Sequence, residues 1–212
     1  MITLSSLRLK TLAGYYHQAN SIWDIGCDHG ILGLSFCEHQ NVRCIHLVDP
    51  SLEVIKSLNT KLIDSYITKK DLIKVHYQKG QEVILDFERK IVFIAGMGGK
   101  EIQEIMKCLL PQLTPADRLV ISPHRNILEL RKYLNASEFK LIDEVTLFED
   151  GQYYQVLCLE TAPGLPKVSL YGDKVWQGLV GEEYRQHQIR AFSLHQDETS
   201  KAFVAYLGQL SH

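Results

Sequence analysis

Ile91-Val-Phe-Ile-Ala95, followed directly by Gly96-Met-Gly-Gly99, is the stretch that decides the expected fold. Its first residues are apolar without alternation, which indicates a strand buried on both faces. The glycines end that strand, and a helix is expected over residues 100–110, before Pro111. A strand, a short loop and a helix in succession are typical of a parallel sheet covered by helices.

The same alternation of apolar runs and helical patterns continues on both sides of this stretch. The segment after Ser51 shows the helical pattern well, because Ser51 is a good N-cap and Val54, Ile55 and Leu58 share one face. The expected strands are residues 21–25, 43–48, 72–77, 91–95 and 118–122, and the expected helices are residues 4–16, 31–39, 51–66, 100–110 and 126–134.

The pattern changes in the last third of the chain. Residues 139–148 and 153–160 are two strand-like runs around Glu149-Asp-Gly-Gln152, and an Asp-Gly pair predicts a tight hairpin. We therefore expect an α/β fold, a doubly wound sheet that ends in an antiparallel hairpin. A Pro- and Gly-containing linker then divides a domain over residues 1–162 from a helical extension over residues 167–212, with a break between two helices near residues 197–200.

Composition limits the classes of function. The 212 residues carry a net charge of −2, so nucleic acid would have to bind to a local patch rather than to a globally basic surface. The five cysteines form no Cys-x-x-Cys pair and indicate reduced thiols in the cytoplasm. No leader or membrane-spanning segment is expected, and no metal, because the nine histidines lack ligand spacing. We expect a monomer or a weak dimer.

Asp24-Ile-Gly26-Cys-Asp28-His-Gly30 lies where the first strand meets its helix. Gly26 and Gly30 would let a ligand approach the backbone closely. Asp28 stands where dinucleotide-binding loops often have a glycine, and its carboxylate would repel a pyrophosphate but favour a cationic sulfonium. This indicates S-adenosylmethionine (SAM) rather than NAD and disfavours a dehydrogenase. The alternative is that these aspartates are only caps and turn residues.

Two further positions follow strand ends. Asp49 ends the second strand, the usual place for an acid that binds ribose hydroxyls, unless it too is a turn residue. The Gly96–Gly99 loop would admit a flat substrate against Met97, although Met97 could instead belong to the core. No Asn/Asp-Pro-Pro-aromatic motif for an exocyclic amino group follows this strand, which favours a ring nitrogen as the methyl acceptor.

Several of these motifs together resemble one enzyme family, the bacterial tRNA (adenine(22)-N1)-methyltransferases, or TrmK family. The pair Asp-Ile-Gly-x-Asp-His and Ala-Gly-Met-Gly-Gly is more specific than either motif alone. The resemblance runs from about residue 4 to residue 160 and is carried by residues 8–15, 24–29, 94–99, 141–145 and 149–151.

The resemblance implies a Rossmann-like class I methyltransferase fold with a seven-stranded sheet, SAM as methyl donor, and a helical C-terminal part that helps hold tRNA. The residues and the resemblance together predict catalysis at Asp28 and His29; cofactor binding at Arg8, Asp24, Gly26, Cys27, Asp28, Gly30, Asp49, Pro50, Gln78, Lys79, Ala95, Gly96 and Met97; and substrate binding at Met97, Gly98, Gly99, Pro123, His124 and Arg125.

The chain departs from the family pattern in three places. Gln78-Lys-Gly80 replaces a Gly-Asp-Gly whose acid touches the adenine amino group of the cofactor, and Ser122-Pro-His124 replaces Gln-Pro-Asn. The C-terminal part is also shorter than usual. A divergent member with a changed substrate is one interpretation; a small-molecule methyltransferase and a SAM-binding protein without catalysis are the others.

The hypothesis for the chemistry is an in-line methyl transfer in which the protein mainly positions the reactants. Asp28 would stabilise the cationic base or accept a proton, and His29 would orient the base. A flipped-out adenine would rest on Met97, Tyr15 or His124. Phosphate contacts would come from three candidate clusters: Lys69, Lys70, Lys74 and Lys79; His124, Arg125, Arg131 and Lys132; and Arg185 and Arg190.

Overall fold

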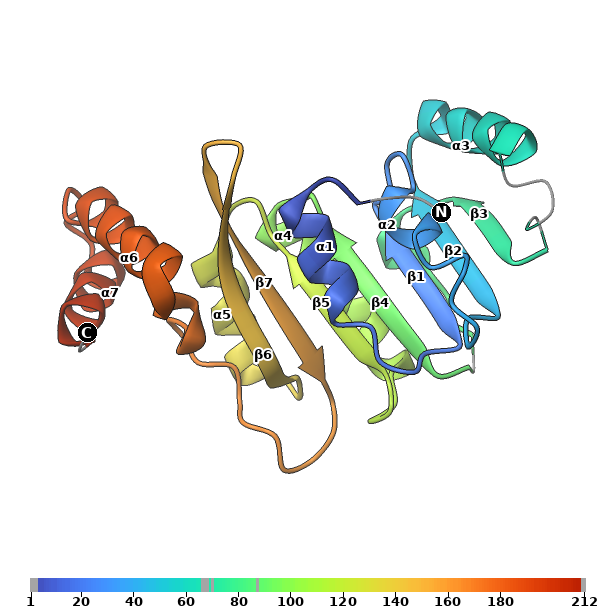
Figure 1. Cartoon of the computed structure of the whole chain (residues 1–212). Coiled ribbons are helices and arrows are strands. Elements are labelled where there is room, and N and C mark those ends of the chain that lie inside the picture. Colours follow the sequence, from blue (N-terminus) through green and yellow to red (C-terminus); the bar gives the residue numbers. More distant parts are fainter. Residues whose placement is uncertain (1–3, 66–68, 70, 87, 211–212) are drawn as a thin grey trace.

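The structure is a computed structural model that describes residues 4–65, 69, 71–86 and 88–210. Within these residues, seven strands form one sheet in the order β3-β2-β1-β4-β5-β7-β6 (Figure 1). The strands are β1 Ser21–Ile25, β2 Cys44–Asp49, β3 Ile73–Tyr77, β4 Lys90–Ala95, β5 Arg118–Ser122, β6 Lys140–Glu149 and β7 Gln152–Glu160.

Pairing in the sheet is parallel from β3 to β5, and β7 runs antiparallel to both β5 and β6. The helices are α1 Leu7–Gly14, α2 Ile31–Leu34, α3 Leu52–Ser65, α4 Gly99–Leu109, α5 Ile127–Ala136, α6 Gly178–Phe192 and α7 Glu198–Gln209, with 3-10 turns η2 Gly80–Glu82, η3 Leu110–Gln112 and η4 Lys174–Trp176. The predicted doubly wound sheet with a terminal hairpin is confirmed.

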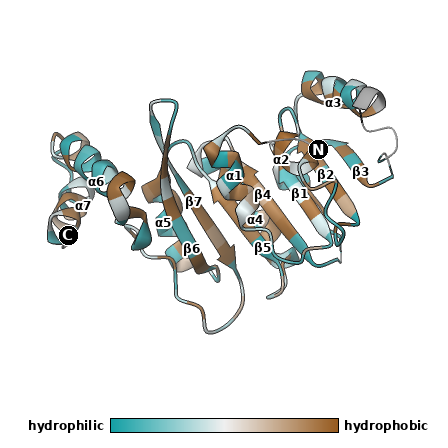
Figure 2. Ribbon diagram, viewed as in Figure 1, coloured by the Kyte–Doolittle hydropathy of each residue, from teal (hydrophilic) through white to brown (hydrophobic). Residues whose placement is uncertain are grey.

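Two hydrophobic cores lie on opposite faces of the sheet, because successive side chains of a strand point to opposite faces. Ile22 and Phe93 face α1, α2 and α3, whereas Val92 and Ile94 face α4 and α5. The strands are accordingly apolar along most of their length (Figure 2). Burial on both faces explains why the apolar runs in the sequence do not alternate.

The β6–β7 turn follows from its two central residues. Asp150 and Gly151 have φ angles of 50° and 77°. Two residues in the left-handed region make the turn whose twist matches that of paired strands, and Asp-Gly adopts it readily. The predicted hairpin is therefore confirmed at its turn as well as in its strands.

One predicted helix end is wrong and one predicted break is displaced. The helix predicted over residues 31–39 ends at Leu34, because Phe36 and Cys37 donate to carbonyls three residues back, in tighter turns. The predicted break between two C-terminal helices is confirmed, but it lies between Phe192 and Glu198, a few residues earlier than predicted, because Asp197 accepts hydrogen bonds from the Ser200 N–H and hydroxyl and caps α7. The predicted end of the 51–66 helix, Tyr66, lies outside the described residues.

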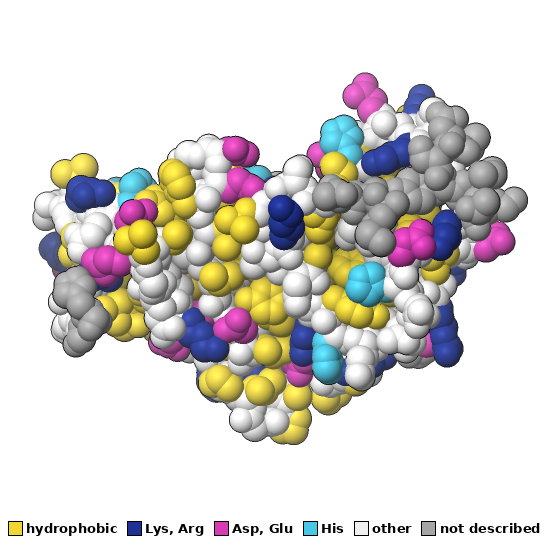
Figure 3. Space-filling view, in the orientation of Figure 1, with side chains coloured by type: hydrophobic (Ala, Val, Ile, Leu, Met, Phe, Trp, Pro, Cys, Tyr) yellow, Lys and Arg dark blue, Asp and Glu magenta, His cyan; other side chains and the backbone are white. Residues whose placement is uncertain are grey.

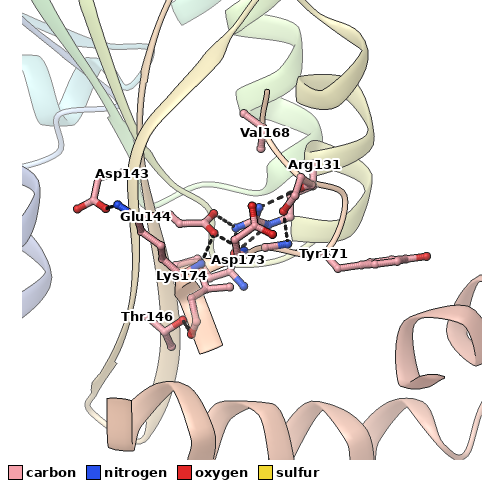
Figure 4. Close-up of polar contacts among 12 residues, drawn as sticks. Arg131, Asp143, Glu144, Thr146, Val168, Tyr171, Asp173 and Lys174 are labelled. Carbon is pink, nitrogen blue, oxygen red and sulfur yellow. Dashed lines mark hydrogen bonds and ion pairs between the residues drawn. The ribbon is translucent and has the colours of Figure 1, made fainter. Parts of the chain in front are cut away.

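The C-terminal segment is attached to the β6 end of the sheet by a buried polar network (Figure 4). Glu144 on β6 accepts from Arg131 on α5 at 2.5 Å and from the backbone N–H groups of Asp173 and Lys174 at 2.6 and 2.9 Å. Thr146 donates to the Val175 carbonyl at 2.7 Å. This network fixes where α6 begins, and α6 and α7 then pack around Trp176, Tyr184 and Phe203.

Candidate active site

A cavity of about 520 Å³ lies at the carboxyl ends of β1, β2 and β4. The strand order reverses between β1 and β4, and ligands of open α/β sheets bind outside such a switch point. Twelve of the predicted site residues line this cavity: Arg8, Asp24, Gly26, Cys27, Asp28, His29, Asp49, Pro50, Ala95, Gly96, Met97 and His124.

The loop after β1 is joined to the end of β2 by backbone hydrogen bonds. Gly26 and Cys27 donate to the Val48 carbonyl at 2.8 and 3.1 Å. Asp49 Oδ2 accepts from the Asp28 N–H at 3.2 Å, and its Oδ1 accepts from the Ser51 N–H at 2.8 Å. Asp28 has a φ of 49°, and its side chain is 71% exposed. The Asp28 carboxylate is therefore presented to the cavity while its backbone is fixed.

Asp24 lies below this loop and is buried. Its Oδ2 accepts the Gly33 N–H at 2.9 Å. Burial, with smaller contributions from the nearby Asp49 and Asp28, raises the pKa of Asp24 to about 7, and the Gly33 hydrogen bond opposes the rise. The geometry gives Asp24 the role of holding the start of α2 under the cavity floor.

Glycine is required at the two places where the loops after β1 and β4 meet. Gly26 has a φ of 72°, and a Cβ there would come within 2.5 Å of Met97 Cε. Gly96 has a φ of 83° and faces open space. Met97 thus packs over Gly26 at the cavity wall, and Gly96 leaves the cavity open beside it.

Arg8 and His124 close one side of the cavity. The Arg8 guanidinium contacts His124 Nε2 and lies 4.8 Å from the Tyr154 ring centre. Burial, together with Arg8 and Arg125, lowers the pKa of His124, so this imidazole is neutral near pH 7. Within the described residues, the buried Arg8 Nε has no hydrogen-bond partner.

Glu149 brings Arg8 to this position. Its carboxylate accepts hydrogen bonds from the Leu7 backbone and, at 2.8 Å, from the Ser6 hydroxyl. The hairpin turn therefore holds the N-terminus of α1 against the sheet, and Arg8 extends from that turn of helix into the cavity.

Seven predicted site residues do not line this cavity: Gly30, Gln78, Lys79, Gly98, Gly99, Pro123 and Arg125. A Cβ on Gly30 would meet Leu58 and Leu47 in the core, and Gly99 lies against the Asn126 carbonyl. Pro123 is buried. Gly30, Gly99 and Pro123 therefore shape the loops rather than the cavity surface, and Arg125 borders a neighbouring cavity.

Tyr15 is not placed to receive a base. Its hydroxyl donates to Asp143 Oδ2 at 3.0 Å, and burial raises its pKa. Tyr15 therefore anchors the end of α1 to β6, and the prediction of a substrate role for it is wrong.

Four lining residues were missed: Leu9, Ile31, Leu32 and Glu101. Each belongs to α1 or to the first turn of a helix that follows a site loop. Glu101 follows directly on the glycine loop, so its position after Gly99 was the available signal. Ile31 and Leu32 similarly follow Gly30 in the sequence.

Each of the three predicted cationic clusters has one member that is paired with an acid. Arg131 is fully buried against Glu144, Arg185 is paired with Glu182 at 2.7 Å, and Lys69 with Glu38 at 3.2 Å. Lys70 lies outside the described residues. On the face shown in Figure 3, Lys and Arg side chains are scattered among Asp and Glu rather than gathered. Arg131 and Arg185 are structural residues, and their prediction as phosphate contacts is wrong.

Comparison with known proteins now adds to this geometry. A family model described as a methyltransferase domain matches residues 5–157. The chain belongs to this methyltransferase-domain family. Bacillus subtilis (strain 168) tRNA (adenine(22)-N(1))-methyltransferase is 33% identical over 159 residues, which cover 73% of this chain and 64% of that relative, just under two thirds of its length.

Solved structures agree with this membership. The crystal structure of the B. subtilis m1A22 tRNA methyltransferase TrmK aligns with a TM-score of 0.76 at 26% identity, covering 98% of this chain and 95% of that one. Sp1610 of Streptococcus pneumoniae, solved in complex with S-adenosyl-L-methionine, aligns at 0.80 and 21% identity, covering 99% and 100%, and shows the shared fold. The predicted resemblance to the TrmK family is confirmed.

The described residues contain neither a membrane-spanning helix nor a metal-binding cluster. No helix among them is long and apolar enough to cross a bilayer. No group of three or more His, Cys, Asp or Glu side chains in the same residues is arranged to hold a metal ion.

Proposed function

We propose that this methyltransferase transfers the methyl group of SAM to N1 of an adenine in tRNA. The observation that carries the proposal is the cavity at the switch point, where Asp28 and Asp49 meet an open, glycine-lined wall. The B. subtilis relative is named for methylation at adenine 22, which makes that position the first to test.

The residues present fit SAM. The unpartnered Arg8 Nε suits a carboxylate, Asp49 at the end of β2 suits ribose hydroxyls, and the exposed Asp28 carboxylate suits a positive charge. The small residues at Gly26 and Gly96 leave room for close approach. When bound, SAM supplies an electrophilic methyl group on a sulfonium. The complex of Sp1610 with SAM supports this fit through the shared fold.

The chain's own residues would act mainly by position and charge. Asp28 lies at the mouth of the cavity, where its carboxylate would stabilise the positive charge that develops on an adenine ring as N1 is alkylated. His29 is 69% exposed beside it and would orient the base. Met97 lines the cavity over Gly26 and offers an apolar surface for a flat ring.

A small-molecule substrate is the second candidate, and one observation favours it: Lys69, Arg131 and Arg185 are already paired. The salt dependence of substrate binding separates the two candidates. Binding of tRNA through phosphates should weaken steeply as salt rises from 50 to 200 mM. An affinity for tRNA that is absent or independent of salt would favour the small molecule.

Calorimetric titration with SAM tests the cofactor part of the proposal. We expect saturable binding to the wild-type chain and at least tenfold weaker binding to Gly26→Val, because any side chain there meets Met97. Absence of binding to the wild-type chain would reject the proposal.

A cytoplasmic location accords with the five free cysteines. A monomeric or weakly dimeric state stays a prediction.

A further inference from the structure

A second cavity, of about 680 Å³, adjoins the candidate active site. It lies between the start of α5, the turn end of the β6–β7 hairpin and one face of α6, elements that are neighbours at the β6 end of the sheet (Figure 1). His124 lines both cavities. The two cavities are therefore separated by the width of one side chain, and neighbouring nucleotides of one strand could occupy them.

Aromatic rings form one wall of this second cavity. Phe148 is 47% exposed, and its ring centre is 4.8 Å from that of Tyr153. The Tyr153 ring also lies 5.5 Å from His187 on α6. A large exposed ring beside a polar cavity is a surface on which a nucleobase can stack, because every base has an apolar face.

Polar side chains among the other lining residues suit a nucleotide. Arg125, next to His124 in the chain, lines the second cavity with its side chain against Gly98, and within the described residues it has no ion-pair partner. The amide groups of Gln152 and Gln188 also line the cavity. Glu129 is the one acid among the described lining residues, and its carboxylate can accept a hydrogen bond from a base amino group.

We propose that this second cavity binds the nucleotide adjacent to the target adenine in the RNA, with its base on Phe148 and its phosphate at Arg125. The inference rests on the proposed function, because it takes tRNA as the substrate. The position of this cavity beside the candidate active site, with His124 lining both, and the unpaired guanidinium favour RNA over a protein segment. The buried network around Glu144 keeps α6 in place as the far wall.

Steady-state methylation of unmodified tRNA transcripts tests this inference. Phe148→Leu keeps an apolar side chain but removes the ring, and should raise KM for tRNA about fivefold or more, the factor expected for one lost base–aromatic stack. The turnover number at saturating tRNA and the Kd for SAM should stay within about twofold. His187→Ala should raise KM in the same direction by a smaller factor.

Leu179→Ala is the matched control, because Leu179 is 76% exposed on α6 and does not line the cavity. It should leave KM, turnover and the thermal midpoint unchanged. A KM for tRNA within twofold of wild type in both Phe148→Leu and His187→Ala, with an active wild-type enzyme, would overturn the inference alone. Absence of methyl transfer to tRNA by the wild type would instead reject the proposed function.

Discussion

The loops at the carboxyl edge of the sheet and the C-terminal end of the molecule use their charged groups in opposite ways. Around the first cavity, the Asp28 side chain is 71% exposed and Arg8 Nε has no hydrogen-bond partner among the described residues, while backbone hydrogen bonds fix the loops. At the β6 end, Arg131 and Glu144 are fully buried and bind only each other and neighbouring protein groups. The first region is therefore suited to bind a ligand, and the second stabilises the fold.

Arg131→Met should have the largest effect of these variants, a loss of folding free energy at the β6 end of the sheet. Glu144 would remain buried without its charged partner, which costs about 3–5 kcal/mol of folding free energy. Urea unfolding monitored by circular dichroism measures this loss. Lys132→Met, on the exposed neighbouring position, is the control and should cost under about 0.5 kcal/mol. A loss below about 1 kcal/mol for Arg131→Met would contradict the structural role.

Asp24→Asn should change how stability depends on pH. The pKa of Asp24 rises from 3.8 to about 7 on folding, so the folded state keeps a proton that the unfolded state releases. Stability from this group is complete below pH 3.8 and is lost as pH rises through about 7. Between pH 4 and 7 the wild type should lose at least about 1.4 kcal/mol, the equivalent of one pKa unit, relative to Asp24→Asn.

Urea unfolding of both proteins at several pH values gives this difference directly, because the other titrating groups are common to both. The Asn side chain can still accept the hydrogen bond from the Gly33 N–H, so the two proteins differ only in the titrating group. A difference that stays constant from pH 4 to pH 7 would mean that Asp24 is already charged in the folded protein.

Asp28→Asn should lower turnover at the first cavity and leave the stability of the fold unchanged. The carboxylate is exposed, so unfolding free energy should change by under about 0.5 kcal/mol. Turnover on tRNA should fall at least about tenfold, because charge stabilisation at the base is lost. Calorimetry should find SAM binding nearly intact. Unchanged turnover would reject the role of Asp28.

Asp49→Asn should have the smallest effect, confined to cofactor affinity. The amide can keep one of the two backbone hydrogen bonds that Asp49 accepts but loses charge-assisted bonding to ribose. We expect the Kd for SAM to rise about fivefold while turnover at saturation is kept. A rise in KM for tRNA with unchanged SAM affinity would mean that Asp49 contacts tRNA rather than SAM.

Much of the fold can be predicted from short segments of the sequence. The Asp150-Gly151 turn needs only the backbone preferences of two residues, and the strands are readable because burial on both faces makes them continuously apolar. The insertion of β7 between β5 and β6 could not be predicted, because it depends on pairing between distant segments. The helix end at Leu34 was missed because the tight turns after it continue the helical pattern, and the break before α7 was placed a few residues late because the cap at Asp197 begins the helix.

The candidate site was readable where residues follow directly on strand ends, as Asp28, Asp49 and Gly96 do. Arg125 and Arg131 show the limit. They lie in one short segment, yet one is free and the other is buried, since only Arg131 faces Glu144 from β6. Gly96 and Gly99 show it again, because one opens into the cavity and the other packs against Asn126.

The most direct test is to incubate the wild-type protein with unmodified tRNA and methyl-labelled SAM and then identify the labelled nucleosides by mass spectrometry. A methyl donor bound in the cavity at the carboxyl edge of the sheet predicts label in 1-methyladenosine, reduced when excess unlabelled S-adenosylhomocysteine competes with the labelled SAM. Label in another nucleoside, or none in RNA although SAM binds, would contradict methyl transfer to adenine N1 by this chain.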